Sequence, residues 1–319
     1  MSFKYHIDGL QEFGYNPINK FGYSFQMYMN TVKRVCELYK CASVLNLKGY
    51  VAHFCYLRLH AFDTFSKVLI EHRDYLSANC LLRMLGDSVS VFKLVYGEKD
   101  KDLLLLRHAL YVIDGCENNL NVLPLRDEND GSLPDDEFED SQNVVRHNRE
   151  HRERLIREAK EILDSSPLKE KNSDAFERIV EDRNWKFKEF KDIKKKNNQY
   201  EWRELYQLID CCQEFDLLSY ISQYVHGLSM SNLIINLNEN VISGVLAEGF
   251  GLLERLHEYT LEFFSEEYRF ILEGLFAPDT RDKIRSYFDE QHRPDDASWN
   301  QAILNKIREA SLWTSSQYN

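Results

Sequence analysis

The sequence contains little glycine and little proline. Its 319 residues include 13 glycines and 6 prolines, whereas folds rich in strands and turns need more of both. Alternation of apolar and polar residues is missing, and no segment repeats at a fixed period. Leucine, glutamate, lysine, arginine and alanine dominate many windows instead, and these residues favour helices. The sequence therefore predicts an all-α fold, an antiparallel helical bundle with additional C-terminal helices.

Long apolar runs and paired cysteines are also missing. No stretch of about 18 apolar residues occurs, so we expect no membrane-spanning segment. The first residues lack the apolar core of a secretory signal. The 7 cysteines are an odd number, include no Cys-x-x-Cys pair and stand mostly among apolar residues. These features predict reduced core thiols, a cytoplasmic location and no structural zinc site.

The common cofactor motifs are absent too. The chain has no Walker loop, no glycine-rich dinucleotide turn and no Gly-x-Ser-x-Gly elbow. Glu254-x-x-His257 matches one half of a di-iron helix motif, but a second Glu-x-x-His is missing. A net charge of -12 makes the whole molecule repel nucleic acid and anionic membranes unless a local basic patch prevails. We predict neither a cofactor nor a metal site.

Breaks in the helical pattern predict three parts of the chain. Residues 1–48 are expected to form an N-terminal arm and the first helix, residues 49–265 the bundle core, and residues 266–319 a helical extension. Within the core, residues 124–140 are expected to form an acidic loop that is open to proteases. Short connections between the first four helices favour antiparallel neighbours. The expected helices cover residues 24–46, 49–72 and 74–96, a segment beginning at 100 or 102, and residues 144–163, 202–226 and 239–264.

The apolar helix expected over residues 74–96 carries a narrow polar stripe. Arg83 and Asp87 lie four residues apart, and Ser90 follows three residues later. At roughly 100° per residue, these side chains share one face of the helix. Because an unpaired charge inside a core is very costly, Arg83 needs Asp87 and further partners from elsewhere in the chain.

A second apolar stretch, residues 217–227, carries a matching stripe. Its polar side chains at helical spacing are Ser219, Ser222, Gln223 and His226. Two polar stripes on buried helices are best satisfied when they face each other. We therefore predict that Arg83 and Asp87 meet Tyr220, Ser222 and His226. Arg83 should bond to Asp87 and to at least one group of the second stretch.

The order of these motifs resembles a prokaryotic all-helical domain family of unknown function. The chain has Arg83-x-x-x-Asp87, then Asn184-Trp185, then Tyr220-x-Ser222-x-x-x-His226. The resemblance covers roughly residues 50–265, and Asp87 stands where the family usually has glutamate. The family is in turn distantly similar to HEPN-type helical domains, many of which are RNA-cleaving toxins or nucleotide-binding modules.

The resemblance implies an RNase or phosphodiesterase of a defence or toxin system, with RNA or a nucleotide as its partner. His226 would move the proton and Arg83 would hold the phosphate as the catalytic residues. Supporting or ligand-binding roles would fall to Asp87, Tyr220, Ser222 and Trp185. The alternative is a non-enzymatic interaction or ligand-sensing module, in which Arg83, Asp87 and His226 form a structural lock. An enzyme needs these residues in an open pocket, whereas a lock needs them sealed.

Two further patterns leave alternatives open. Arg146 and His151 have the Arg-x-x-x-x-His spacing of HEPN nucleases, in a charged helix where such spacing also arises by chance. As a site, this pair requires a second copy in a homo-oligomer. The lysines between Lys186 and Lys196 interleave with aromatic residues, which suits single-stranded nucleic acid. The alternative is an amphipathic helix whose aromatic side chains face the core.

Overall fold

The computed structural model describes residues 16–39, 43–123, 125–126, 128–129, 131–211, 216–226 and 238–268. Within these ranges the regular structure is helical, and the only β pairing is an isolated bridge between Phe187 and Gln199. The all-α prediction is confirmed. No helix in these ranges is both long and apolar enough to cross a bilayer. Most of the predicted N-terminal arm and of the C-terminal extension lies outside the described residues.

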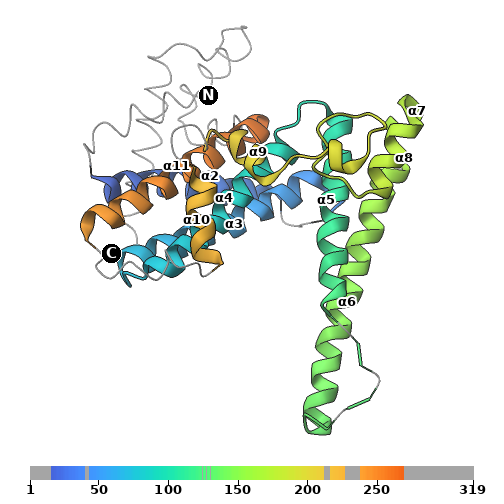
Figure 1. Ribbon diagram of the computed structural model, residues 1–319, viewed down its shortest axis with the longest axis horizontal. Coiled ribbons are helices and arrows are strands. Elements are labelled where there is room, and N and C mark those ends of the chain that lie inside the picture. Colours follow the sequence, from blue (N-terminus) through green and yellow to red (C-terminus); the bar gives the residue numbers. More distant parts are fainter. Residues whose placement is uncertain are drawn as a thin grey trace. The chain divides into compact units, whose positions relative to one another are not determined.

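The chain divides into two compact units (Figure 1). The first unit contains residues 1–40, 51–93 and 206–319, and the second contains residues 41–50 and 94–205. Each unit therefore draws on segments that are far apart in the sequence.

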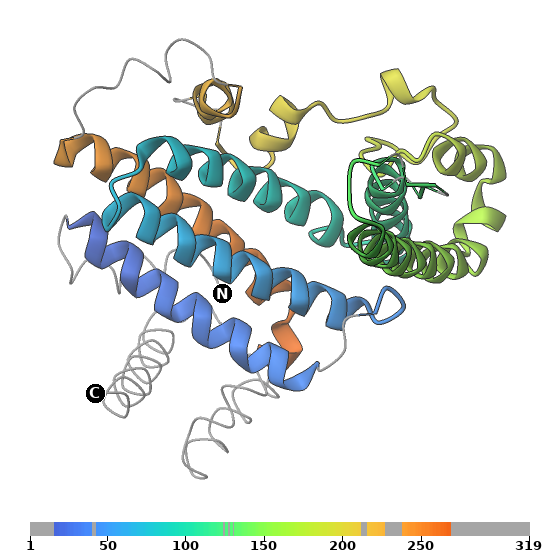
Figure 2. The ribbon, with the colours of Figure 1, turned by 90° about the horizontal axis from the view of Figure 1, so that it is seen from below.

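Four long helices form the body of the first unit. They are α2 (Pro17–Leu38), α3 (Leu47–Ile70), α4 (Tyr75–Tyr96) and α11 (Glu239–Phe263). Their first-unit segments lie side by side in Figure 2, and α2 packs directly against α11. Large side chains that are fully buried fill the space between them, and removal of this apolar surface from water is the main stabilising term. They include Tyr28, Phe62, Phe65, Leu82 and Phe92.

The first helix begins and ends earlier than the sequence suggested. The side chain of Asn16 accepts hydrogen bonds from the backbone N–H groups of Ile18 and Asn19, and Pro17 occupies the first turn. Both features start helices, because the cap satisfies free donors and proline has a suitable φ. Ser24, the position where the sequence predicted the helix to begin, is instead fully buried within it. The expectation that this helix runs to residue 46 is wrong, since α2 ends at Leu38.

The second unit is built on a long pair of helices, α5 (Lys101–Asn121) and α6 (Asp135–Asp164). They pack against each other along α5, and the first part of α6 extends beyond the end of α5 (Figure 1). Arg149 of α6 donates to the carbonyls of Leu120 and Leu123 at that end. α6 begins nine residues earlier than the helix predicted from residue 144. Residues 135–140 are therefore helix and not loop, because acidic side chains in a first turn interact favourably with the helix dipole.

The lysine-rich stretch after Trp185 is also different from its prediction. Residues 186–194 form no helix and fold back in turns, and the short helices α7 (Leu168–Lys171) and α8 (Ser173–Glu181) precede them. The stretch ends in a single 3-10 turn, η2 (Lys195–Asn197). Trp185 and Phe187 are buried, which confirms that these two aromatic side chains face the core. The amphipathic helix that was expected to carry them is wrong, because this stretch is not helical.

The helix predicted over residues 202–226 is two helices. α9 (Trp202–Gln207) ends first, and α10 (Leu217–Val225) begins after Asp216, whose side chain caps it. Asp210 between them has a positive φ of 54°, a left-handed conformation that ends helical geometry. Both helices contribute residues of the first unit to the candidate site.

Candidate functional site

Arg83 and Asp87 form an ion pair on one face of α4, as predicted. The Nε atom of Arg83 lies 2.9 Å from Oδ1 of Asp87, and the two side chains are 17% and 30% exposed. Burial raises the pKa of the Asp87 carboxyl, while Arg83 and Tyr206 act in the opposite direction. The partners therefore offset only part of the desolvation, and the net shift of the Asp87 pKa is upward.

Tyr206 of α9 completes this pair, and it is not among the site residues predicted from the sequence. Its hydroxyl donates to Oδ1 of Asp87 over 2.9 Å. Gly86 makes the approach possible, because a Cβ atom at that position would overlap the phenol of Tyr206. The signal available in the sequence was the glycine itself, which stands inside an otherwise apolar helix.

Ser222 joins the cluster from α10. The guanidinium of Arg83 donates through Nη1 to the hydroxyl of Ser222, which itself donates to the carbonyl of Leu218 over 2.6 Å. The predicted meeting of the two polar stripes is thus confirmed for Arg83, Asp87 and Ser222. We call Arg83, Asp87, Tyr206 and Ser222 the polar lock, because they connect α4 to α9 and α10.

His226 takes no part in the polar lock. It is the C-terminal cap of α10, its side chain is exposed, and its backbone N–H donates to the carbonyl of Ser222 over 3.1 Å. Within the described residues, its imidazole makes no hydrogen bond or ion pair with Arg83 or any other group. The expected proton-moving residue and the expected phosphate clamp are therefore not connected by a direct contact.

Trp185 belongs to the second unit and has its contacts there. Its indole N–H donates to Oδ2 of Asp114 over 3.1 Å, and its ring packs edge-on against Tyr111. Arg107 donates to the backbone carbonyl of Phe187, and its guanidinium carbon lies 3.9 Å from the centre of the Phe187 ring. These contacts give Trp185 a packing role beside a buried arginine.

Arg146 and His151 do not form a pair on α6. Arg146 is exposed and donates to Asn143 over 2.7 Å, whereas His151 contacts Arg154 over 2.9 Å. Partial burial and the nearby arginines lower the pKa of His151. Each residue thus has a neighbour of its own on the helix, and no contact within the described chain connects the two.

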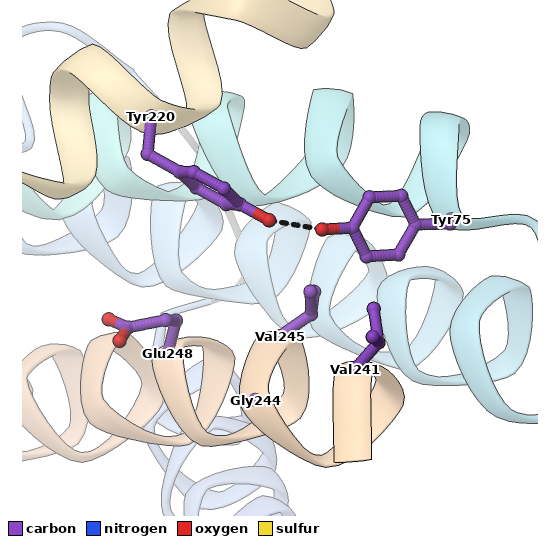
Figure 3. Close-up of a pocket in the computed structure, with 6 residues that line it drawn as sticks. All are labelled: Tyr75, Tyr220, Val241, Gly244, Val245 and Glu248. Carbon is purple, nitrogen blue, oxygen red and sulfur yellow. Dashed lines mark hydrogen bonds between the residues drawn. The ribbon is translucent and has the colours of Figure 1, made fainter. Parts of the chain in front are cut away.

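Tyr220 is the predicted site residue that lines a pocket. The pocket has a volume of about 320 Å³ and lies between α4, α10 and α11 of the first unit (Figure 3). Its described lining residues are Tyr75, Tyr220, Val241, Gly244, Val245 and Glu248. Pockets of this size are at the lower end of those that hold small molecules. Arg83 and His226 are not among the lining residues.

Three tyrosines meet at one side of this pocket. The hydroxyls of Tyr75 and Tyr220 are hydrogen-bonded, as Figure 3 shows, and each lies 3.3 Å from the hydroxyl of Tyr224. Burial raises the pKa of Tyr75 to about 12 and raises that of Tyr220 as well. Both phenols are therefore neutral at physiological pH and act as hydrogen-bonding groups.

The opposite side of the pocket is one face of α11. Val241 precedes Gly244 and Val245 by three and four residues, and Glu248 follows them by four and three, which places all four on one face of the helix. Burial raises the pKa of the Glu248 carboxyl. A Cβ atom at Gly244 would meet nothing within 4 Å, so this position opens onto free space. The row lies in the helix that the sequence predicts over residues 239–264, but no motif in the sequence marks it as the wall of a pocket.

A metal site is not indicated. The described residues contain no group of three or more His, Cys, Asp or Glu side chains arranged to hold a metal ion. Glu254 and His257, half of a di-iron motif in sequence, are both buried in the first unit. Nε2 of His257 lies 3.0 Å from the hydroxyl of Thr31, so this motif belongs to a network between α2 and α11.

Comparisons of the chain with protein-family models, with curated proteins and with solved structures find no match. The resemblance to HEPN-type helical domains therefore stays a prediction from the motif order. The local geometry of the first unit is the remaining basis for a functional proposal.

Proposed function

We propose that this protein is a non-enzymatic ligand-binding module. The observation that supports the proposal is the pocket between α4, α10 and α11, in which hydroxyls and a carboxylate stand among apolar side chains. A small number of polar groups on apolar walls is typical of sites that bind and orient a small molecule.

The polar lock supports the same proposal. Ser222 and Tyr220 are two residues apart on α10, so the bond from Arg83 to Ser222 also fixes the helix that carries Tyr220. Tyr220 in turn bonds to Tyr75 at the start of the helix that carries Arg83. The charged cluster thus holds one wall of the pocket, which is the positioning role that a rigid binding site needs.

A screen of small metabolites by thermal shift tests the proposal. We expect at least one compound to raise the melting temperature of the full chain, because a ligand that binds only the folded state stabilises it. The Gly244→Leu variant should lose this shift, since the new side chain would occupy the pocket. It should still fold, because leucine is a better helix former than glycine.

Gly115→Leu is the matched control. Gly115 is also an exposed glycine inside a helix with nothing within 4 Å of its Cβ position, but it lies in α5 and does not line the pocket. It should keep the full ligand shift. If no compound gives a shift that Gly244→Leu removes and Gly115→Leu retains, the proposal is wrong.

The RNase hypothesis is the second candidate function. Its support is the motif order and the exposure of His226, whose imidazole is accessible to a substrate. Against it stand the bonds of Arg83 to Asp87 and Ser222, which already occupy the expected phosphate clamp. Incubation with labelled RNA tests it. Cleavage that disappears in His226→Ala, with an unchanged melting temperature, would favour this function over the binding module.

A further inference from the structure

Among the described residues that line it, the pocket between α4, α10 and α11 has one sign of charge. Glu248 is the only residue with an acidic side chain in the described lining, and no lysine, arginine or histidine is among the described lining residues. Figure 3 shows Glu248 at one end of the row of lining residues on α11, with Tyr220 of α10 on the opposite side. An anionic ligand would therefore meet a carboxylate without a cation to offset the repulsion.

The carboxylate of Glu248 is not paired with an opposite charge among the residues that the structure describes. Within the described chain, no hydrogen bond or ion pair joins it to another residue. Burial raises its pKa, and the field of Arg255 opposes this only partly. Arg255 is directed elsewhere, since it donates to the carbonyl of Gly251 over 2.9 Å. A cation bound beside Glu248 would supply the missing counter-charge.

The tyrosines favour a cation for a separate reason. The hydroxyls of Tyr75, Tyr220 and Tyr224 lie close enough to one another to donate among themselves, so their outward-facing groups are mainly oxygen lone pairs. Tyrosine rings also attract cations, because the ring face is negative. Lone pairs and aromatic faces both interact favourably with an ammonium group and unfavourably with an anion.

Apolar walls complete the site. Val241 and Val245 contribute only hydrocarbon, and Gly244 leaves room where another residue would have a side chain. A volume of about 320 Å³ fits a small molecule. From these features we propose that the pocket binds an organic cation, an ammonium group on a small apolar body, with Glu248 as counter-charge and Tyr75 and Tyr220 as its aromatic wall. The inference rests on the proposed function and names the ligand class.

Matched pairs of probes test the charge requirement. Choline and 3,3-dimethyl-1-butanol have the same shape and differ in charge, and benzylamine and benzyl alcohol form a second pair. Titration of the full chain followed by calorimetry should give at least tenfold tighter binding of the cation in one pair or both. Glu248→Gln should weaken the cation at least tenfold and leave the neutral probe within twofold. Glu262→Gln, an exposed carboxylate at the end of the same helix, is the control and should change neither.

The outcomes separate this inference from the function it rests on. If neither cation binds more tightly than its neutral partner, or if Glu248→Gln affects both members of a pair equally, the cation inference is wrong. The binding function then still stands, provided that the metabolite screen yields a compound whose shift is lost in Gly244→Leu. If the metabolite screen yields no such compound, the proposed ligand-binding function is itself wrong.

Discussion

At the scale of single residues, a few buried polar side chains have a large effect on the stability of the first unit. Because their surroundings are apolar, substitution or a change of pH at these positions changes the free energy of unfolding. Asp87 and Glu254 are both carboxyls whose pKa is raised by burial, but their surroundings differ. At Asp87, Arg83 and Tyr206 oppose the effect of burial, whereas Glu254 is 2% exposed and burial raises its pKa to about 8. The two positions therefore respond differently to substitution and to pH.

Removal of Arg83 should strongly destabilise the protein. Arg83→Ala leaves Asp87 with its charge partly buried and its strongest partner missing, which costs on the order of 3 kcal/mol in the free energy of unfolding. Urea unfolding of Arg83→Ala and of the parent protein measures this loss of stability. The control Arg34→Ala removes an exposed pair with Glu37 and should change the free energy of unfolding by less than about 1 kcal/mol. Equal effects of the two substitutions would contradict the polar lock.

Glu254 should make stability fall as the pH rises. Its pKa is about 8 in the folded protein and close to the ordinary value of 4.5 when unfolded. Between these values unfolding releases a proton, so stability is highest below about pH 4.5 and declines up to pH 8, by at most about 1.4 kcal/mol per pH unit. Glu254→Gln stays neutral, so its stability relative to the parent should increase across this window. If the difference in the free energy of unfolding between the parent and Glu254→Gln is constant from pH 5 to pH 8, Glu254 is not a buried neutral carboxyl.

At the scale of the helices, the ends that could be predicted are those with a recognisable capping residue in the sequence. The side chain of Asp100 caps α5 by accepting from Asp102 and Leu103, and the predicted start at residue 100 or 102 agrees with it. Residues 124–140 were predicted as an acidic loop because the helical pattern breaks there. Asp135, Asp136 and Glu137 nevertheless form the first turn of α6, where their charges interact favourably with the helix dipole.

The corrected start of α6 has a proteolytic consequence. Endoproteinase Glu-C should cut the native chain after Glu128 and spare Glu137 and Glu139 at first. All three are exposed, but Glu137 and Glu139 lie in α6 and Glu128 lies before it. Mass spectrometry of early fragments measures the order of cleavage, and a retained circular-dichroism spectrum shows that the nick is local. Simultaneous cleavage at all three glutamates would mean that α6 frays to residue 140.

The candidate site was predictable only in part, for a physical reason. Arg83, Asp87 and Ser222 stand out because a polar side chain on an apolar helix must find a partner. Tyr75, Gly244 and Glu248 carry no such signal, since a pocket forms where helices leave space and not where a motif repeats. Tyr220 was selected for its place in a resemblance, and the structure gives it a wall of the pocket.

At the scale of the whole molecule, net charge weighs against nucleic acid as a partner. The chain carries -12, and lysines of the basic stretch have partners in the second unit. Lys188 pairs with Glu204, Lys191 with Glu189, and Lys186 lies 5.2 Å from the ring centre of Trp202. These contacts occupy side chains that would otherwise bind phosphates.

We therefore expect no saturable binding of single-stranded oligouridylate at about 150 mM salt, where long-range attraction is screened. Fluorescence anisotropy with a labelled oligonucleotide measures this. Submicromolar binding that weakens when Lys186 and Lys188 are replaced by glutamine would show that the basic stretch prevails over the net charge.

Ligand contact with the pocket between α4, α10 and α11 is the central claim, and one spectrum tests it most directly. The aromatic carbon–proton correlation spectrum of full-length protein with labelled tyrosine should be recorded during titration with choline or with a compound from the thermal screen. The resonances of Tyr75 and Tyr220 should shift in a saturable way, and the same titration of Gly244→Leu should leave them unchanged. Saturable shifts that spare both tyrosines, or that persist in Gly244→Leu, would place the ligand elsewhere and contradict the account.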